Sequence, residues 1–169
     1  FESLLVCGST SKAEGDMLYY ALEKNIKPIF IPELKRELCL FSDMVAFKKN
    51  YNIIKIEQPD IIHTHTAKAG TLGRFAGIFY ILLHPFDNRR IRLIHTFHGH
   101  IFEGYFNRLQ TQVFILIERF LAIFTSKIIT VSDSVRNELI ALRICHERKI
   151  KVIPLGLELD KFLKIPIRD

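Results

Sequence analysis

Short apolar and β-branched runs alternate along this chain with longer segments in which apolar residues recur at helical spacing. Six runs are predicted to be strands: residues 3–7, 28–31, 60–64, 92–96, 127–131 and 150–153. Strands that take turns with helices form parallel β-α-β units. The runs are nearly continuous in apolar residues, which is typical of a sheet covered on both faces. We therefore predict an α/β fold with a doubly wound, mostly parallel sheet, helices on both faces, and at least one further strand upstream.

The segments between these strands are predicted to be helices. Asn25 is expected to end the first helix, Ser42 to cap the second, and Ser132 or Ser134 to cap the last. In the helix at residues 69–83 we expect five apolar side chains to face inward: Leu72, Phe75, Ala76, Phe79 and Leu83. The helix at residues 107–124 carries an apolar stripe at Leu109, Val113, Leu116, Phe120 and Phe124.

Length and composition limit the class of protein. The 169 residues are enough for one domain with a sizeable core, and an apolar fraction of 49% excludes a disordered or fibrous chain. A formal net charge of +6 favours anionic partners such as phosphorylated ligands or an anionic membrane surface. The apolar stretches at residues 75–83 and 113–124 are shorter than the roughly 20 residues that span a bilayer. Three widely spaced cysteines favour a reduced, cytoplasmic location.

Histidines gather where two neighbouring strands end, which is where open α/β sheets bind ligands. Five of the seven histidines lie there: His63, His65, His95, His98 and His100. His63 and His95 are within apolar strands, so we interpret them as core side chains bonded to the backbone, and His65 stays ambiguous. His98 and His100 follow the strand beside Gly99, where a ligand can approach the backbone, so we favour a functional role for both.

A glycine-rich helix start follows the first histidine pair. Gly70 and Gly73 are interpreted as close-packing positions, while the free N–H groups of a helix start can also bind an anion. Lys68 and Arg74 flank this start, and together they would make a phosphate or carboxylate contact. The chain has no GxxxxGK[ST] loop, no GxGxxG fingerprint and no GxSxG elbow, and Cys7 is interpreted as a buried structural thiol.

Four ordered motifs resemble family 4 glycosyltransferases, and the likeness runs from about residue 8 to residue 162. Residues 59–74 (PDIIHTHTAKAGTLGR) resemble a "PDIVHTHxxKAGxLGR" stretch, and residues 95–106 (HTFHGHIFEGYF) resemble a bacterial "HTFHGHxFxGYF" segment. Residues 128–134 (IITVSDS) are similar to "IITVSES", and residues 151–162 (KVIPLGLELDKF) to the "VIPNGxDxxxF" junction, with Leu155 in place of the common Asn.

This resemblance implies half of a GT-B fold. Residues 1–162 would be the Rossmann-like N-terminal, acceptor-side domain without its first β-α unit, and residues 163–169 would begin the linker to an absent donor-binding domain. The resemblance implies a retaining transferase that uses a nucleotide-sugar donor and a glycan or lipid-linked acceptor, with no metal or other cofactor, and a fragment that is inactive alone. It implies a catalytic role for His98, substrate contacts from Lys68, Arg74, His65, His100 and Glu103, and donor-proximal positions at Ser132 and Gly156.

Two alternatives remain open from the residues alone. The His63-x-His65 and His98-x-His100 pairs have spacing compatible with metal ligation in a hydrolase, although Glu103 is the nearest carboxylate. The Phe-rich helix and the basic excess fit a non-catalytic module that docks on anionic lipid, a reading that overlaps with a transferase on the inner face of the plasma membrane. Nucleic acid is not expected as a partner, since the basic residues are scattered and no recognition motif is present.

Overall fold

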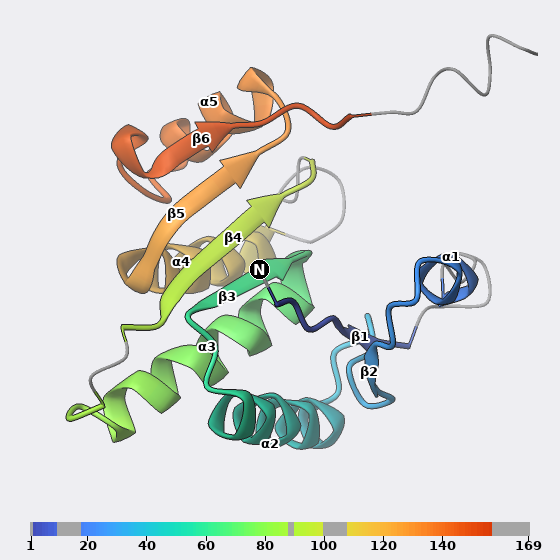
Figure 1. The fold of residues 1–169 in the computed structure, drawn as a ribbon. Coiled ribbons are helices and arrows are strands. Elements are labelled where there is room, and N and C mark those ends of the chain that lie inside the picture. The colour runs from blue at the N-terminus through green and yellow to red at the C-terminus, as the bar shows by residue number, and fades with distance from the viewer. Residues whose placement is uncertain (1, 10–17, 88–89, 100–107, 157–169) are drawn as a thin grey trace, which may run out of the picture.

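The computed structural model describes residues 2–9, 18–87, 90–99 and 108–156. Along these ranges, strands and helices alternate as the sequence predicts (Figure 1). The strands are β1 (Val6–Gly8), β2 (Ile29–Ile31), β3 (Ile61–His65), β4 (Arg92–Phe97), β5 (Thr125–Thr130) and β6 (Ile150–Val152). The helices are α1 (Leu18–Glu23), α2 (Leu40–Glu57), α3 (Ala67–Leu83), α4 (Arg108–Phe124) and α5 (Asp133–Ala141), with a short 3₁₀ turn at Glu147–Lys149.

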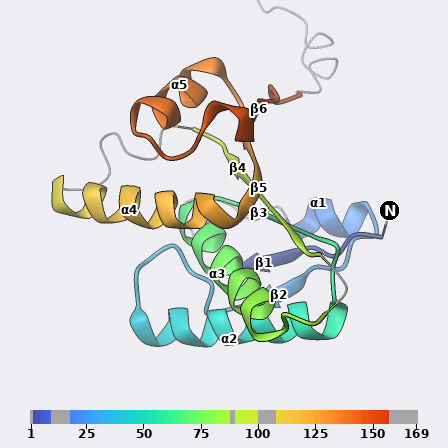
Figure 2. The same ribbon diagram turned by 90° about the vertical axis from the view of Figure 1, so that its left-hand side faces the viewer.

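All the strand pairs in the described ranges are parallel, and they form two separate groups. β1 pairs with β2, and the order of the larger group is β3-β4-β5-β6. Figure 2 shows α1 and α2 on opposite sides of β1 and β2. The fold is therefore α/β with parallel sheets and helices on both faces, as predicted. The ladder between β1 and β3 is not formed among the described residues, so the single continuous sheet that we expected is divided there.

Helix ends agree with the sequence in two places and differ in a third. Asn25 has a left-handed φ of 57° just beyond α1, and the Ile26 N–H donates to the Ala21 carbonyl, as expected for a helix C-terminus. Ser132 caps α5 by accepting from the Val135 N–H at 3.3 Å. The cap predicted at Ser42 is wrong, because α2 begins two residues earlier and the Asp43 carboxylate reaches back to the Cys39 N–H at 3.2 Å.

Glycines bring α3 unusually close to the strands beneath it. A Cβ on Gly70 would overlap the His95 ring, and one on Gly77 would lie 2.7 Å from Leu93 Cδ2. A Cβ on Gly73 would lie 3.0 Å from Thr64 Cγ2. The three glycines recur at intervals of three and four residues, so they form one face of the helix. This contact confirms that Gly70 and Gly73 are close-packing positions.

The prediction of the inward face of α3 is partly wrong, because the glycines of the helix lie against the strands. Ala76 is fully buried, but Phe79 and Leu83 are about half exposed. The apolar stripe of α4 also points outward, because Ile115, Leu121 and Ala122 form the buried side of that helix. Glycines take the part of α3 that lies on the strands, and Phe79, Leu82 and Leu83 are left on the outer side.

Much of the core lies between the larger sheet and helices α3, α4 and α5. One cluster joins β4 and β5 to α4 and α5: Phe97, Ile115, Ala122, Ile128, Val135, Leu139 and Ile144. A second joins α2 to α3 through Ile54, Ala76 and Tyr80. Within the described ranges, no helix is both long enough and apolar enough to cross a lipid bilayer.

We predict that Gly70→Ala destabilises the protein by about 1–3 kcal/mol, because the new methyl group would overlap the His95 ring. An ordinary Gly→Ala change inside a helix stabilises by about 1 kcal/mol, so the sign of the effect is diagnostic. Urea unfolding followed by circular dichroism measures it. Gly156→Ala is the matched control, since a Cβ there meets nothing within 4 Å among the described residues. A more stable Gly70→Ala protein would contradict the packing described for α3.

Candidate functional site

The carboxyl ends of β3 and β4 bring two of the predicted site histidines into contact. His65 is the last residue of β3 and pairs in register with Thr96, two residues before His98. The two parallel strands end at the same edge of the sheet, so His65 and His98 meet there. His65 Nδ1 lies 2.9 Å from His98 Nε2, and both rings are exposed. At this distance the N–H of one ring donates a hydrogen bond to the unprotonated nitrogen of the other ring.

A third histidine extends this pair into a row. His63 and His65 are alternate residues of one strand, so their rings share a face, with centroids 4.4 Å apart. The His65 and His98 centroids are 5.1 Å apart. His63 Nε2 lies 2.8 Å from the Thr96 hydroxyl, so the core histidine predicted to bond to the backbone is instead exposed and bonded to a side chain.

Desolvation favours the neutral form of the two histidines on β3, His63 and His65. Partial burial lowers the pKa of His63, and the neighbouring His98 lowers it further. Partial burial also lowers the pKa of His65, followed by repulsion from His63 and His98. Neutral imidazoles can both donate and accept hydrogen bonds, so the row offers directional contacts to the hydroxyl groups of a ligand.

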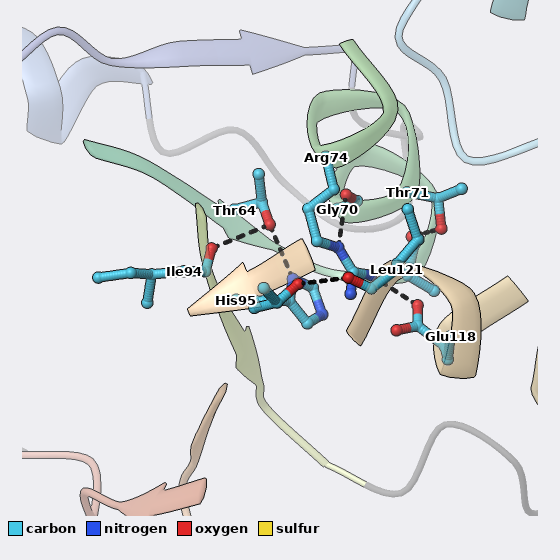
Figure 3. A network of polar contacts seen from close by, with 10 residues as sticks. Thr64, Gly70, Thr71, Arg74, Ile94, His95, Glu118 and Leu121 are labelled. Carbon is cyan, nitrogen blue, oxygen red and sulfur yellow. Dashed lines mark hydrogen bonds and ion pairs between the residues drawn. The ribbon is translucent and has the colours of Figure 1, made fainter. Parts of the chain in front are cut away.

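Arg74 lies in the interior rather than at the surface. Its side chain is fully buried, its Nη2 donates to Glu118 Oε1 at 2.7 Å, and its Nε donates to the Gly70 carbonyl at 3.0 Å (Figure 3). Glu118 is on α4 and is itself 4% exposed. The sequence motif predicted a substrate contact for Arg74, whereas in the structure Arg74 is one half of a buried ion pair between α3 and α4.

His95 joins the same buried region from β4. Its Nδ1 lies 2.9 Å from the Thr64 hydroxyl, which donates to the Ile94 carbonyl at 3.3 Å and therefore accepts from His95 (Figure 3). His95 is thus a core residue, as predicted, and its ring is hydrogen-bonded to the backbone of Thr64 as well as to its hydroxyl group. Burial holds the pKa of His95 well below its usual range, and the positive charge of Arg74 lowers it further.

Lys68 is also engaged within the protein. Its Nζ lies 2.5 Å from Asp43 Oδ1 and contacts the Glu37 carbonyl, and its side chain is 12% exposed. These contacts join the first turn of α3 to the start of α2. Thr66, which connects β3 to α3, has φ 62° and ψ 164°, a conformation that costs a β-branched residue on the order of 1–3 kcal/mol. The chain therefore makes a strained turn directly after His65.

The remaining predicted residues lie along the same edge or outside the described ranges. Ser132 follows β5, and Gly156 lies beyond β6 with its surface exposed. His100 and Glu103 fall outside the described residues, so the structure does not place them. Among the residues that are described, no group of three or more histidine, cysteine, aspartate or glutamate side chains is arranged to hold a metal ion.

Sequence reasoning did not identify Glu118, Thr64 or Thr96 as polar partners. Glu118 carried a signal, because it is the one acidic residue in the apolar run at residues 113–124. A charge inside such a run requires a partner when the helix is buried. The threonines carried no comparable signal, since threonine is common in strands.

The comparisons with known proteins agree on the class of this domain. The family model for glycosyltransferase family 4 matches residues 3–161. The chain therefore belongs to glycosyltransferase family 4, and its fold is the Rossmann-like type found in GT-B proteins.

Two curated relatives are longer than this chain. It is 31% identical over 166 residues to an Escherichia coli UDP-Gal:alpha-D-GlcNAc-diphosphoundecaprenol alpha-1,3-galactosyltransferase, covering 96% of this chain and 38% of that protein. It is 29% identical over 139 residues to the Staphylococcus aureus capsular polysaccharide biosynthesis glycosyltransferase CapM, covering 76% of this chain and 33% of that protein. The chain thus spans about a third of the length of both relatives.

Solved structures share the fold at low identity. A glycosyltransferase from Rickettsia africae has a TM-score of 0.60 at 19% identity, covering 97% of this chain and 38% of that chain. A putative UDP-N-acetylglucosamine 2-epimerase from Listeria monocytogenes has a TM-score of 0.61 at 18% identity, covering 89% and 36%. These likenesses support the architecture alone.

We predict that Glu118→Gln lowers the free energy of unfolding by about 3–5 kcal/mol, because it leaves the Arg74 charge buried without a counter-charge. The double change Arg74→Met with Glu118→Leu removes both charges and should restore much of that loss. Urea unfolding of the three proteins measures both effects. Equal stability of Glu118→Gln and the unchanged protein would show that Arg74 is not held by this pair.

We also predict that the protein loses stability as the pH falls below about 6.5. The folded state lowers the pKa of His95, His63 and His65, so below this pH the unfolded chain binds protons that the folded chain does not. The stabilisation is complete above the unfolded pKa and disappears as the pH falls toward the folded values. Urea midpoints at about pH 7.5 and 5.5 measure it. His95→Gln should flatten this dependence, and an unchanged slope in that variant would contradict the role given to burial.

Proposed function

We propose that this domain is the acceptor-side, N-terminal half of a retaining glycosyltransferase. It would act with a donor-binding domain to transfer a sugar from a nucleotide-sugar to a glycan or lipid-linked acceptor. The observation that carries the proposal is the contact between His65 and His98 at the carboxyl ends of β3 and β4, in a chain of family 4. The E. coli relative, named for a UDP-Gal donor and a diphosphoundecaprenol-linked acceptor, supports both substrate classes.

His98 is the residue that we place at the reacting centre. During transfer, the bond from the anomeric carbon to the donor diphosphate breaks, and a bond to the acceptor oxygen forms. The acceptor proton leaves with the diphosphate. Charge develops on the sugar and on the diphosphate, so a fixed hydrogen-bonding group near them lowers the barrier. The ring of His98 can serve in this way because His65 holds one of its nitrogens at 2.9 Å and so fixes the ring's orientation.

The other residues take positions around this pair. His65 would orient His98, and His100 and Glu103 are proposed as acceptor contacts on the segment that follows His98. Lys68 and Arg74 are each paired with a carboxylate. We therefore propose that they position the start of α3 and do not contact the substrate directly. Ser132 and Gly156 lie beyond β5 and β6 and are proposed to face the donor. We propose that the transfer requires no metal or organic cofactor and that the protein is located in the cytoplasm.

The divided sheet supports the proposal that a first β-α unit is missing from the residues described. Doubly wound sheets commonly have the strand order 3-2-1-4-5-6, in which the first strand lies at the centre. Here β2 and β1 would take the places of strands 3 and 2, and β3, β4 and β5 those of strands 4, 5 and 6, with β6 as one further strand. A strand inserted between β1 and β3 would join the two groups and pair the free edge of β3, where Ile61 is half exposed.

We predict that His98→Ala, made in a protein that carries both domains, lowers turnover by on the order of 10²-fold while the fold is retained. Release of the nucleotide diphosphate in the presence of donor and acceptor measures turnover. The matched control is His84→Ala, since His84 follows α3 at the opposite edge of the sheet. The domain without its donor-binding partner gives the baseline, because we expect it to be inactive. An unchanged rate in His98→Ala would refute the assignment.

A further inference from the structure

A His-Thr dipeptide occurs in both of the strands that carry the candidate site. β3 contains His63-Thr64, and β4 contains His95-Thr96. In the parallel ladder, Thr64 is the register partner of His95. Successive side chains of a strand point to opposite faces, so each dipeptide presents its histidine to one face and its threonine to the other. The two strands together therefore carry one histidine and one threonine on each face of the sheet.

The pair on the face covered by α3 is buried and joins the two strands. His95 Nδ1 lies 2.9 Å from the Thr64 hydroxyl, which donates to the Ile94 carbonyl at 3.3 Å (Figure 3). A Cβ on Gly70 of α3 would overlap the His95 ring. A Cβ on Gly73 would lie 3.0 Å from Thr64 Cγ2. The helix thus lies directly on this pair and leaves it little room to move.

The pair on the opposite face joins Thr96 of β4 to His63 of β3. His63 Nε2 lies 2.8 Å from the Thr96 hydroxyl. Thr96 is buried, whereas His63 is exposed. An exposed imidazole can turn about its two side-chain torsions, and a hydrogen bond to a fixed group selects one of the resulting orientations. A buried hydroxyl on one strand therefore sets the orientation of an exposed ring on the other.

The His63 ring in turn lies against the ring of His65. Their centroids are 4.4 Å apart, and the two rings are inclined by 36°. His65 also contacts His98, with centroids 5.1 Å apart and a nitrogen of each ring in hydrogen-bond contact at 2.9 Å. His65 thus contacts two imidazoles. One of them is held by Thr96, and the other is the ring that we place at the reacting centre.

We propose that Thr96 is a positioning residue for this site. Its hydroxyl holds His63, and the held ring keeps His65 in the orientation that meets His98. Displacement of a reacting group by about 1 Å can lower a rate by on the order of 10²-fold, so the order of these rings matters for transfer. The effect on turnover rests on the proposed function, because it requires His98 at the reacting centre. The order of the rings does not.

Two changes of Thr96 separate its hydroxyl from its shape, in a protein that carries both domains. Thr96→Val keeps the volume and removes the hydroxyl, so it should lower kcat by about three- to tenfold, the equivalent of one hydrogen bond. The KM values for donor and acceptor should stay within about twofold, because Thr96 is buried. Thr96→Ser retains the hydroxyl and should keep most of the turnover. A Thr96→Ser protein as slow as Thr96→Val would overturn the proposal.

Nitrogen-15 NMR of the same protein, labelled at histidine, measures the order of the rings without turnover. The shifts of the imidazole nitrogens distinguish the two neutral tautomers, and we expect His63 and His65 each to populate one of them. Thr96→Val should move both rings toward the tautomer mixture of a free imidazole, and Thr96→Ser should not. Unchanged His65 signals in Thr96→Val would overturn the proposal.

His63→Phe tests whether the effect of Thr96 passes through the His63 ring. This change keeps a ring beside His65 and removes the nitrogen that contacts Thr96. It should slow turnover as Thr96→Val does, and the double variant should be no slower than the single variants. Losses that add in the double variant would show that Thr96 acts by another route and would overturn the proposal.

The matched control is Thr125→Val, which makes the same chemical change at the opposite edge of the sheet. Thr125 is the first residue of β5, it is fully buried, and its hydroxyl donates to the Leu121 carbonyl at 2.8 Å. The change should lower stability, as measured by urea unfolding, and leave kcat and the histidine signals unchanged. An equal fall of kcat in the two valine variants would trace the loss to stability and overturn the proposal.

His98→Ala separates a failure of this inference from a failure of the proposed function. A slow His98→Ala protein together with a Thr96→Val protein at full rate would overturn the positioning role and leave the proposed function standing. An unchanged rate in His98→Ala, with the His65 signals altered in Thr96→Val, would refute the proposed function and still support the control of ring orientation by Thr96.

Discussion

The close approach of α3 to β3 and β4 is the contact on which the rest of this domain depends. Gly70 and Gly77 leave room for the His95 ring and for Leu93, so the helix lies almost directly on the strands. That approach puts Arg74 between the helix and the sheet, where its side chain reaches Glu118 on α4. The position of α4 is therefore set through α3, and the two strands that carry the site histidines are fixed beneath the same helix.

The buried ion pair holds α3 and α4 together, and burial favours the neutral form of His63, His65 and His95. Burying the charges of Arg74 and Glu118 costs several kcal/mol per ion, which their mutual attraction offsets only while both are present. The same arginine disfavours protonation of His95, which stays neutral below the edge of the sheet. The pKa values of His63 and His65 are also lowered, which favours their neutral forms. Imidazoles held neutral in fixed contact present defined hydrogen bonds to a ligand.

Sequence patterns predicted where the helices and strands lie in the chain better than they predicted which side of each helix is buried. The strand and helix positions were predicted to within a few residues, and so were the ends at Asn25 and Ser132. The inward face of α3 was predicted only in part, since Ala76 is buried but Phe79 and Leu83 are about half exposed. Periodicity shows which residues share a face but not which face meets the sheet. Arg74 was misplaced for a related reason: its partner Glu118 is 44 residues away, and local sequence cannot reveal that pairing. The meeting of His65 with His98 followed from topology, since adjacent parallel strands end at one edge.

The apolar outer face is a consequence of the same close packing. Because α3 turns its glycines toward the sheet, Phe79, Leu82 and Leu83 lie on its outer side, and the Phe75 and Phe79 rings contact Phe120 of α4 and Phe47 of α2. A surface of this kind is rarely displayed by a monomeric protein without use, because large apolar patches promote association. Here it begins where the histidine row lies, since the helices start at the edge where the strands end.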